Sequence, residues 1–447
     1  IDRGGYRLAR RGTASEAVLR AEERFECHPG SSKPLDGVNP ILIDTGLVGD
    51  QTDPEAADEM EAIGEQHIET GTDAGRSRLS GDCHHHEGKP GPELMHPRRQ
   101  LSVGAVVAWL LLAQPAAAQT APSAAVRSTV ARLSVRQQVG QLIMPWLLGD
   151  YNAVDAEGLA RARAWVDSLE IGGIVISIGS PLDVASKLNF LQRRSKLPLL
   201  IASDLEGGAA FRFAGATPFP TNMGVGASGR EQDAFTMGWA TGREGRAVGV
   251  HLTFSPVADV NNNPANPIIN TRSFGEDSYL VARLVSAAVQ GLQQHGMLAT
   301  AKHFPGHGDT ETDSHLTLPL IPTPWRRLDT LELIPFRAAV SAGVALIMSA
   351  HVAMPAISGS RERPATLDPA VMQGVLRDSL GFRGLVVTDA LDMGGIVSTY
   401  GAGEAAVLAF LAGADLLLQP ADRVVQRDAD RRRVDVVGAL REAHVLV

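Results

Sequence analysis

The sequence predicts a (β/α)8 barrel of the TIM type, and two observations indicate it. Between residues 128 and 447, eight short apolar runs alternate with stretches of helical spacing. The runs are apolar on both faces, which is typical of parallel strands buried between layers. Eight such units over roughly 320 residues fit one closed barrel. An open doubly wound sheet is the alternative, but no Gly-x-Gly-x-x-Gly motif follows the first run.

The elements follow one another along the chain in a regular order. The expected strands are 141–145, 173–177, 199–203, 252–255, 298–301, 346–349, 385–388 and 416–418. Expected helices between them include 159–169, 233–246, 279–295, 328–342 and 369–380. Residues 434–447 keep helical spacing and are expected to form the eighth helix. The chain stops abruptly there, so we expect further sequence beyond Val447.

The N-terminal part differs from the rest. Residues 1–94 show no apolar period, and we expect them to be disordered or to be upstream sequence read in frame. Residues 95–118 combine a basic start, an apolar run and an Ala-x-Ala site, the order found in a secretory signal peptide. A buried helix or an uncleaved anchor is the alternative. Residues 119–127 are expected to be a linker, and the barrel domain to cover 128–447.

These features predict an exported protein, periplasmic or secreted, without stable membrane insertion once the signal is removed. The net charge is −9 and aromatic residues make up 5 % of the chain, which argues against a nucleic-acid partner. No cofactor is expected, and nothing in the sequence fixes the oligomeric state.

The stretch 302–315 is the richest in titratable groups, with three histidines, three acids and a lysine in a loop that contains two glycines and a proline. Polar residues also follow the other expected strands. In a (β/α)8 barrel these strand ends meet at one face and form the active site. The residues concerned are Asp204, Glu206, Asp259, Lys302, His303, His351 and Asp389.

A metal site is an alternative for this loop. His303, His307, Asp309, Asp313 and His315 could all supply ligands. However, their spacing matches no zinc pattern, and the adjacent lysine would repel a cation. No metal is therefore expected.

The loop resembles the signature of family 3 glycoside hydrolases, in particular the β-N-acetylglucosaminidase branch. Residues 204–208, 256–261, 272–277 and 388–393 are similar to other motifs of that family and occur in the family's order. The resemblance extends over about residues 127 to 420. It implies a retaining hydrolase of terminal β-linked N-acetylglucosamine, possible substrates being peptidoglycan fragments.

The resemblance implies three catalytic residues. Asp389 would be the nucleophile, which agrees with its place directly after a strand; a helix N-cap is the alternative. His315 would be the acid/base and Asp313 would orient and polarise it, in place of the second carboxylic acid of most retaining enzymes. Taken alone, the Asp-x-His spacing is equally compatible with a surface pair.

The resemblance also implies the residues that bind the sugar. Lys302 and His303 would donate to its hydroxyl groups, although a strand-end histidine can also be a core residue. Asp204 would accept and Arg272 would donate. Arg212 is a further candidate, because the arginine that this branch has after Glu-Gly-Gly is Ala209 here. Glu206, Asp259 and His307 are expected to shape the loops.

Other functions remain open from the sequence. A β-glucosidase or β-xylosidase of the same family is one, although these take their acid/base from a second domain and lack the Asp-x-His pair. A phosphate-accepting enzyme is another, because a histidine acid/base does not repel an anion. A catalytically inactive barrel that binds glycans is the alternative outside enzymes.

Overall fold

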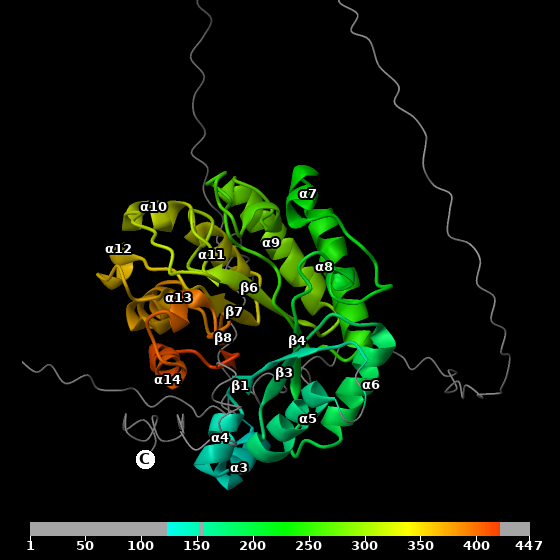
Figure 1. Cartoon of the computed structure of the whole chain (residues 1–447). Helices are drawn as coiled ribbons and strands as arrows, with labels where there is room; N and C mark the ends of the chain where they lie inside the picture. Colours follow the sequence, from blue (N-terminus) through cyan, green and yellow to red (C-terminus); the bar gives the residue numbers. More distant parts are fainter. Residues whose placement is uncertain (1–122, 152, 154–155, 421–447) are drawn as a thin grey trace, which may run out of the picture. The chain divides into compact units, whose positions relative to one another are not determined.

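The computed structural model describes residues 123–151, 153 and 156–420. Parallel strands form the wall of a barrel, and helices surround it (Figure 1). The strands are β1 (Ile143–Met144), β2 (Trp146–Leu148), β3 (Gly173–Ser177), β4 (Leu200–Ser203), β5 (Leu252–Thr253), β6 (Leu298–Phe304), β7 (Leu346–Ser349), β8 (Leu385–Thr388) and β9 (Leu417–Leu418).

The sheet returns to its starting point. Strands β2 to β8 pair in sequence order, each parallel to the next. Leu416, next to β9, bridges to Val387 of β8, and β9 pairs with β1. Because β1 and β2 are two parts of one run interrupted by Pro145, the ring has eight strand positions. The predicted (β/α)8 barrel is confirmed.

Alternation along the strands separates two apolar cores. Val175, Ala202 and Val387 belong to one cluster, which fills the barrel interior. Their neighbours, such as Ile176 and Val386, belong to the second cluster, which lies between the strands and the helices. Both faces of most strands are thus buried, which explains why they appear in the sequence as continuous apolar runs; β2 is the exception, since Trp146 and Leu148 are exposed.

Several helices begin at residues whose side chains cap the first turn. The side chain of Ser180 accepts from the backbone of Asp183 at the start of α6, and Asp277 accepts from two backbone N–H groups at the start of α9. The α-helices are α3 (Ala124–Arg132), α4 (Val135–Gly140), α5 (Glu157–Ala164), α6 (Pro181–Gln192), α7 (Asn222–Ala227), α8 (Glu231–Ala247), α9 (Ser278–Gln293), α10 (Trp325–Thr330), α11 (Leu333–Ser341), α12 (Pro355–Ser358), α13 (Gly394–Val397) and α14 (Ala402–Ala412).

Shorter or irregular helical turns complete the shell. They are η1 (Trp165–Leu169), η2 (Ala209–Phe211), η3 (Asn270–Arg272), η4 (Ala365–Leu367) and η5 (Ala370–Ser379). Of these, η2 and η3 lie in the connections that follow β4 and β5, and they bring residues of those loops to the mouth of the barrel.

Helices α8 and α9 pack closely because glycines remove side chains from their contact. A Cβ atom at Gly242 would lie 2.6 Å from the carbonyl oxygen of Leu292. A Cβ atom at Gly291 would collide with the carbonyl oxygen of Phe235. The close approach of these helices therefore depends on small residues in both of them.

The expected elements agree with the structure within a few residues, with two differences. Helix α3 begins at Ala124, inside the expected linker, because Ser123 caps it and Val126 and Val130 are buried. The expected helix 328–342 is divided into α10 and α11. The expected segments 1–94, 95–118 and 434–447 lie outside the described residues. Within the described part, no helix is both long and apolar enough to span a membrane.

Candidate active site

Strand alternation directs two carboxylates into the mouth of the barrel. Ala202 and Val387 point into the interior, so the next residues of the same parity, Asp204 and Asp389, do so as well. Strands β4 and β8 are four positions apart in a ring of eight. The two carboxylates therefore approach the mouth from opposite sides.

A cluster of ion pairs lies at the ends of β4 and β6. The Lys302 ammonium is 2.8 Å from Asp204 Oδ1 and 2.7 Å from Glu206 Oε1. Arg272 contacts both carboxylate oxygens of Glu206, at 2.9 and 2.8 Å. Lys302 is only 3 % exposed, so its charge needs these partners. Two cations and two carboxylates thus hold one another in place.

The charge states of Glu206 and Lys302 are set by the oppositely charged groups that contact them. Burial opposes the charge of Glu206, but Lys302 and Arg272 outweigh it and hold its pKa far below the ordinary range. Burial likewise opposes the charge of Lys302, and Asp204 and Glu206 overcome it and raise its pKa. Glu206 and Lys302 are therefore charged at neutral pH, and each offers a fixed acceptor or donor.

Asp259 organises the start of the loop that follows β6. Its Oδ2 atom lies 2.7 Å from His303 Nδ1 and accepts from the backbone N–H of His303. Its Oδ1 atom accepts from the backbone N–H of His307 at 2.7 Å. Asp259 is fully buried, yet these contacts keep its pKa below the usual range against the effect of burial. This confirms the expectation that it shapes the loop.

His307 clamps the middle of the same loop. Its Nδ1 is 2.9 Å from the Thr310 hydroxyl, and its Nε2 is 2.9 Å from the Ser314 hydroxyl. Thr310 donates its own proton to the His307 carbonyl, so it accepts from Nδ1, and Ser314 donates to Nε2. Gly308 lets the loop pass against Val260, whose carbonyl a Cβ atom would strike.

Asp313 and His315 form a close pair at the end of this loop. Asp313 Oδ1 is 2.7 Å from His315 Nδ1 and accepts from the His315 backbone at 2.8 Å. These contacts outweigh burial and lower the pKa of Asp313. With Nδ1 directed at the carboxylate, Nε2 is the nitrogen left for proton exchange. The His315 side chain is 56 % exposed, so it reaches solvent directly.

The same loop is attached to the segment after Asp389. The backbone N–H of Gly394 donates to the His315 carbonyl at 2.9 Å, and that of Gly395 donates to the Ser314 carbonyl at 3.0 Å. A Cβ atom at Gly394 would collide with the loop backbone. The acid/base candidate and the nucleophile candidate are therefore held at the same rim.

Asp389 is held in place by hydrogen bonds with the backbone of two neighbouring residues. Its N–H donates to the Ser349 carbonyl at 3.1 Å, and its Oδ1 accepts from the N–H of Ala390 at 2.8 Å. Burial would raise the pKa of Asp389, but His303 opposes burial and the pKa is lowered, with the N–H of Ala390 and Lys302 contributing. The carboxylate is ionised at neutral pH, as a nucleophile requires.

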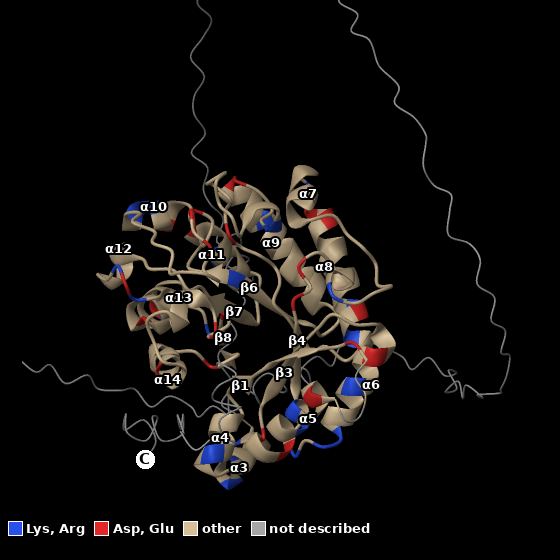
Figure 2. Ribbon diagram, in the orientation of Figure 1, with Lys and Arg blue, Asp and Glu red and all other residues tan. Residues whose placement is uncertain are grey.

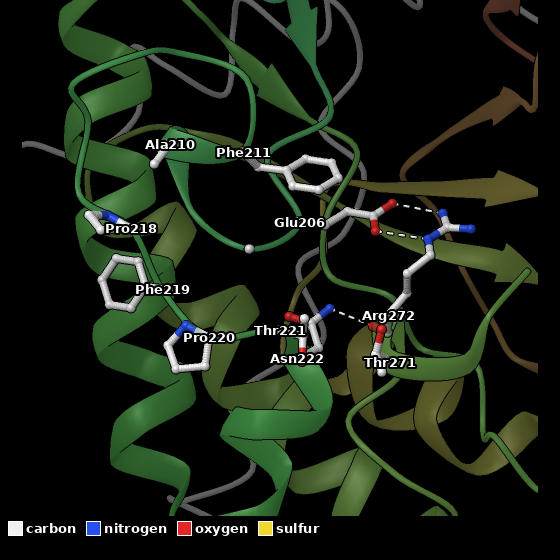
Figure 3. Close-up of a pocket in the computed structure, with 11 residues that line it drawn as sticks. Glu206, Ala210, Phe211, Pro218, Phe219, Pro220, Thr221, Asn222, Thr271 and Arg272 are labelled. Carbon is white, nitrogen blue, oxygen red and sulfur yellow. Dashed lines mark hydrogen bonds and ion pairs between the residues drawn. The ribbon is translucent and has the colours of Figure 1, made fainter. Parts of the chain in front are cut away.

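A cavity of about 280 Å³ adjoins the ion cluster, with Glu206 and Arg272 in its wall (Figure 3). Its other walls are largely apolar and include Phe211, Phe219 and Pro220. The guanidinium of the predicted site residue Arg212 lies over the Phe211 ring at 4.4 Å and is 3.8 Å from Asp204. Arg212 thus lies beside the cluster.

The structure brings the predicted sugar-binding residues together. Lys302, Asp204 and Arg212 are linked by ion pairs, and Arg272 Nη2 is 3.3 Å from His303 Nε2. The sequence analysis missed the direct bonds of Glu206 to the cations and the aromatic wall at Phe211. The acid could have been suspected from the Asp-x-Glu spacing, which places both carboxylates on one side of an extended segment.

The metal ligands considered for the loop are engaged with one another or with neighbouring groups. Asp259 holds His303, Asp313 holds His315, and two hydroxyl groups hold His307. Across the described residues, no three His, Cys, Asp or Glu side chains converge as a metal-binding group.

Comparison with known proteins finds relatives that are named as glycoside-cleaving enzymes. A β-hexosaminidase A of Pseudoalteromonas piscicida is 36 % identical over 293 residues, which is 60 % of this chain and 49 % of that protein. A β-N-acetylglucosaminidase/β-glucosidase of Cellulomonas fimi is 35 % identical over 302 residues, 66 % of this chain and 52 % of that protein. The chain spans about half the length of these two relatives.

Solved structures agree. A glycoside hydrolase family 3 β-N-acetylglucosaminidase of Paenibacillus sp. str. FPU-7 matches with a TM-score of 0.63 and 42 % identity, over 70 % of this chain and 59 % of that one. The β-glucoside phosphorylase BglX matches with a TM-score of 0.65 and 28 % identity, over 72 % and 57 %. The family profile described as glycosyl hydrolase family 3 N terminal domain matches residues 134–445. The chain therefore belongs to glycosyl hydrolase family 3.

Proposed function

We propose that this chain carries the catalytic barrel of a retaining β-N-acetylhexosaminidase that removes terminal β-linked N-acetylglucosamine. One observation carries the proposal. Asp389 and the Asp313–His315 pair come from separate stretches, and backbone hydrogen bonds fasten the pair to the residues just after Asp389. A carboxylate and a proton donor at one rim are the two groups that retaining hydrolysis needs.

The reaction follows in two steps. Asp389 attacks the anomeric carbon while His315 gives its Nε2 proton to the departing glycosidic oxygen, so that the old bond breaks and a glycosyl ester forms. His315 then takes a proton from water, which attacks the same carbon and frees Asp389. Asp313 accepts from Nδ1 throughout, orients the imidazole and stabilises its cation.

The ion cluster suits the hydroxyl groups of the sugar. Asp204 supplies an acceptor, and Lys302 and Arg272 supply donors, with His303 and Arg212 beside them. Because the members of the cluster already hold one another, they need little rearrangement when the sugar binds. The curated relatives named as hexosaminidases support an N-acetylated sugar.

The decisive experiment is Asp389→Asn, assayed on an aryl β-N-acetylglucosaminide. We expect kcat to fall at least about 10³-fold, because the amide cannot form the ester. Asp392→Asn, three residues further on, is the matched control and should retain activity. Turnover by Asp389→Asn at the wild-type rate would refute the assignment, and sugar binding by a wild type without turnover would indicate a glycan-binding barrel.

A phosphate-accepting reaction is the second candidate. His315 carries no negative charge, so it does not repel an anionic acceptor as a carboxylate would. One solved structure similar to this chain is named a β-glucoside phosphorylase. Product analysis in phosphate buffer separates the two reactions, because phosphorolysis yields a sugar 1-phosphate and hydrolysis yields the free sugar.

We also propose that the protein is exported, and that peptidoglycan fragments are among its substrates. The support is the order of basic, apolar and Ala-x-Ala segments in residues 95–118. Mass spectrometry of the N-terminus of the protein from its native host should find a mature chain that starts near Gln119. A chain that retains residues 95–118 would contradict export by signal cleavage.

A further inference from the structure

His351 lies beneath the candidate nucleophile, and no step of the proposed reaction uses it. It follows β7 by two residues and is fully buried. A buried imidazole needs a hydrogen-bond partner for each ring nitrogen. Both partners are present, and one of them belongs to the residue directly after Asp389.

The contacts define the tautomer of this histidine. Its Nε2 lies 2.9 Å from the Ala390 carbonyl oxygen, which can only accept, so Nε2 carries the proton. Its Nδ1 lies 2.9 Å from the Thr366 hydroxyl. Burial lowers the pKa of His351, which favours the neutral ring. The Thr366 hydroxyl that contacts Nδ1 also lies 2.9 Å from the Ala350 carbonyl oxygen.

The arrangement forms a chain that ends at the nucleophile. Ser349 Oγ donates to the Thr366 hydroxyl at 3.0 Å, Thr366 faces His351, and His351 donates to Ala390. Ala390 in turn donates its N–H to Asp389 Oδ1, and Asp389 donates its own N–H to the Ser349 carbonyl. The circuit thus begins and ends on the same residue of β7.

We infer that His351 is a positioning residue, which holds the Ala390 peptide and through it the carboxylate of Asp389 in the orientation for attack. This inference rests on the proposed retaining mechanism. It predicts a selective defect. Among the described residues, His351 makes its hydrogen bonds to Thr366 and Ala390 and none to the side chains of the ion cluster, so its loss should slow the chemical step and leave sugar binding intact.

The test compares four variants on an aryl β-N-acetylglucosaminide, with N-acetylglucosamine as a competitive inhibitor. In His351→Leu the Ala390 carbonyl loses its donor, and we expect kcat to fall about 10²-fold, as for a small misplacement of a reacting group. His351→Gln can place an amide N–H near the same carbonyl and should recover much of that loss. The inhibition constant of N-acetylglucosamine should change less than about threefold in every variant, because the groups that bind the sugar are unaltered.

A matched pair of hydroxyl deletions gives the second arm. Thr366→Val removes the hydroxyl that contacts Nδ1 at nearly constant shape and should lower kcat about 5- to 10-fold, in line with the loss of that hydrogen bond. Thr300→Val is the control: this hydroxyl is buried in β6 and has no hydrogen-bond partner among the described groups. Thr300→Val should stay within about twofold of the wild type, since it removes no bond.

The results of these assays distinguish failure of the positioning role of His351 from failure of the proposed function. If His351→Leu or Thr366→Val matches Thr300→Val in kcat, the positioning role is wrong while the proposed function stands. A parallel loss of N-acetylglucosamine binding would mean a general collapse of the site and would also overturn the role. If His351→Leu fails to fold, His351→Gln and Thr366→Val still decide. An inactive wild type would remove the proposed function and this role with it.

Discussion

At the scale of single residues, the site is built from buried charges that satisfy one another. Lys302 is the central cation: its ammonium lies between Asp204 and Glu206 and is almost inaccessible to solvent. Such a group is stabilising only while its partners remain, because an unpaired charge in the interior is costly. Its removal should therefore affect both binding and stability.

We predict that Lys302→Met lowers kcat/KM about 10³-fold and destabilises the fold by roughly 3 kcal/mol, because Asp204 and Glu206 lose a buried partner. Lys187→Met is the matched control. Lys187 is also a buried lysine, but it bonds the carbonyl of Leu148 outside the ion cluster. Kinetics and chemical denaturation measure the two effects, and an equal loss of activity in both variants would contradict the assignment.

At the scale of elements, α8 and α9 show how composition sets geometry. These helices contact each other through glycines, and a methyl group at Gly242 would lie 2.6 Å from a backbone oxygen of α9. Backbone atoms cannot move aside as a flexible side chain can. Sequence periodicity predicted both helices, but it could not predict their close approach, because that depends on which glycines face each other.

Gly242→Ala should destabilise the protein by about 1–3 kcal/mol, the usual cost of overpacking, even though alanine favours helices. Gly374→Ala is the control, since a Cβ atom there meets nothing within 4 Å. It should be neutral or slightly stabilising. Thermal and denaturant unfolding of the two variants give the comparison, and a stable Gly242→Ala protein would show that the helices can separate at little cost.

At the scale of the whole molecule, charges of both signs are distributed over the outer helices visible in Figure 2. The free energy of unfolding depends on acid pH for a different reason: some histidines are buried in their neutral form inside the fold. Burial lowers the pKa of His307 to about 4, with His303 contributing, and burial with the nearby Arg246 does the same for His251. In the unfolded chain both titrate near 6.5.

Between pH 6.5 and 4 the unfolded chain binds protons that the folded chain does not, so the free energy of unfolding should fall as the pH falls through this window. The full effect of His307 is on the order of 3 kcal/mol. Carboxylates with lowered pKa add their own loss only near and below pH 4.5. Denaturation at pH 5 to 7 should show the slope, and His307→Gln should reduce it; a flat profile would contradict the buried neutral form.

The sequence was sufficient for the strands and for the rim residues, because both follow from local alternation. Asp389 and Lys302 could be placed at the mouth from their position after a buried run. The partners across the mouth could not, since Arg272 and Glu206 are 66 residues apart and meet only after the ring closes. The roles of His351 and Phe211 depend likewise on packing between distant segments, which no local pattern encodes.

The attachment of Gly394 and Gly395 to the His315 loop has a consequence for how products leave. A loop tied at that point cannot swing outward as a free flap without loosening the segment that carries Asp389. Departure of the cleaved alcohol and entry of water must then occur past a stationary imidazole. The rate of turnover in such an enzyme would then depend on how fast product and water diffuse through a mouth of constant width, and little on the opening and closing of a loop.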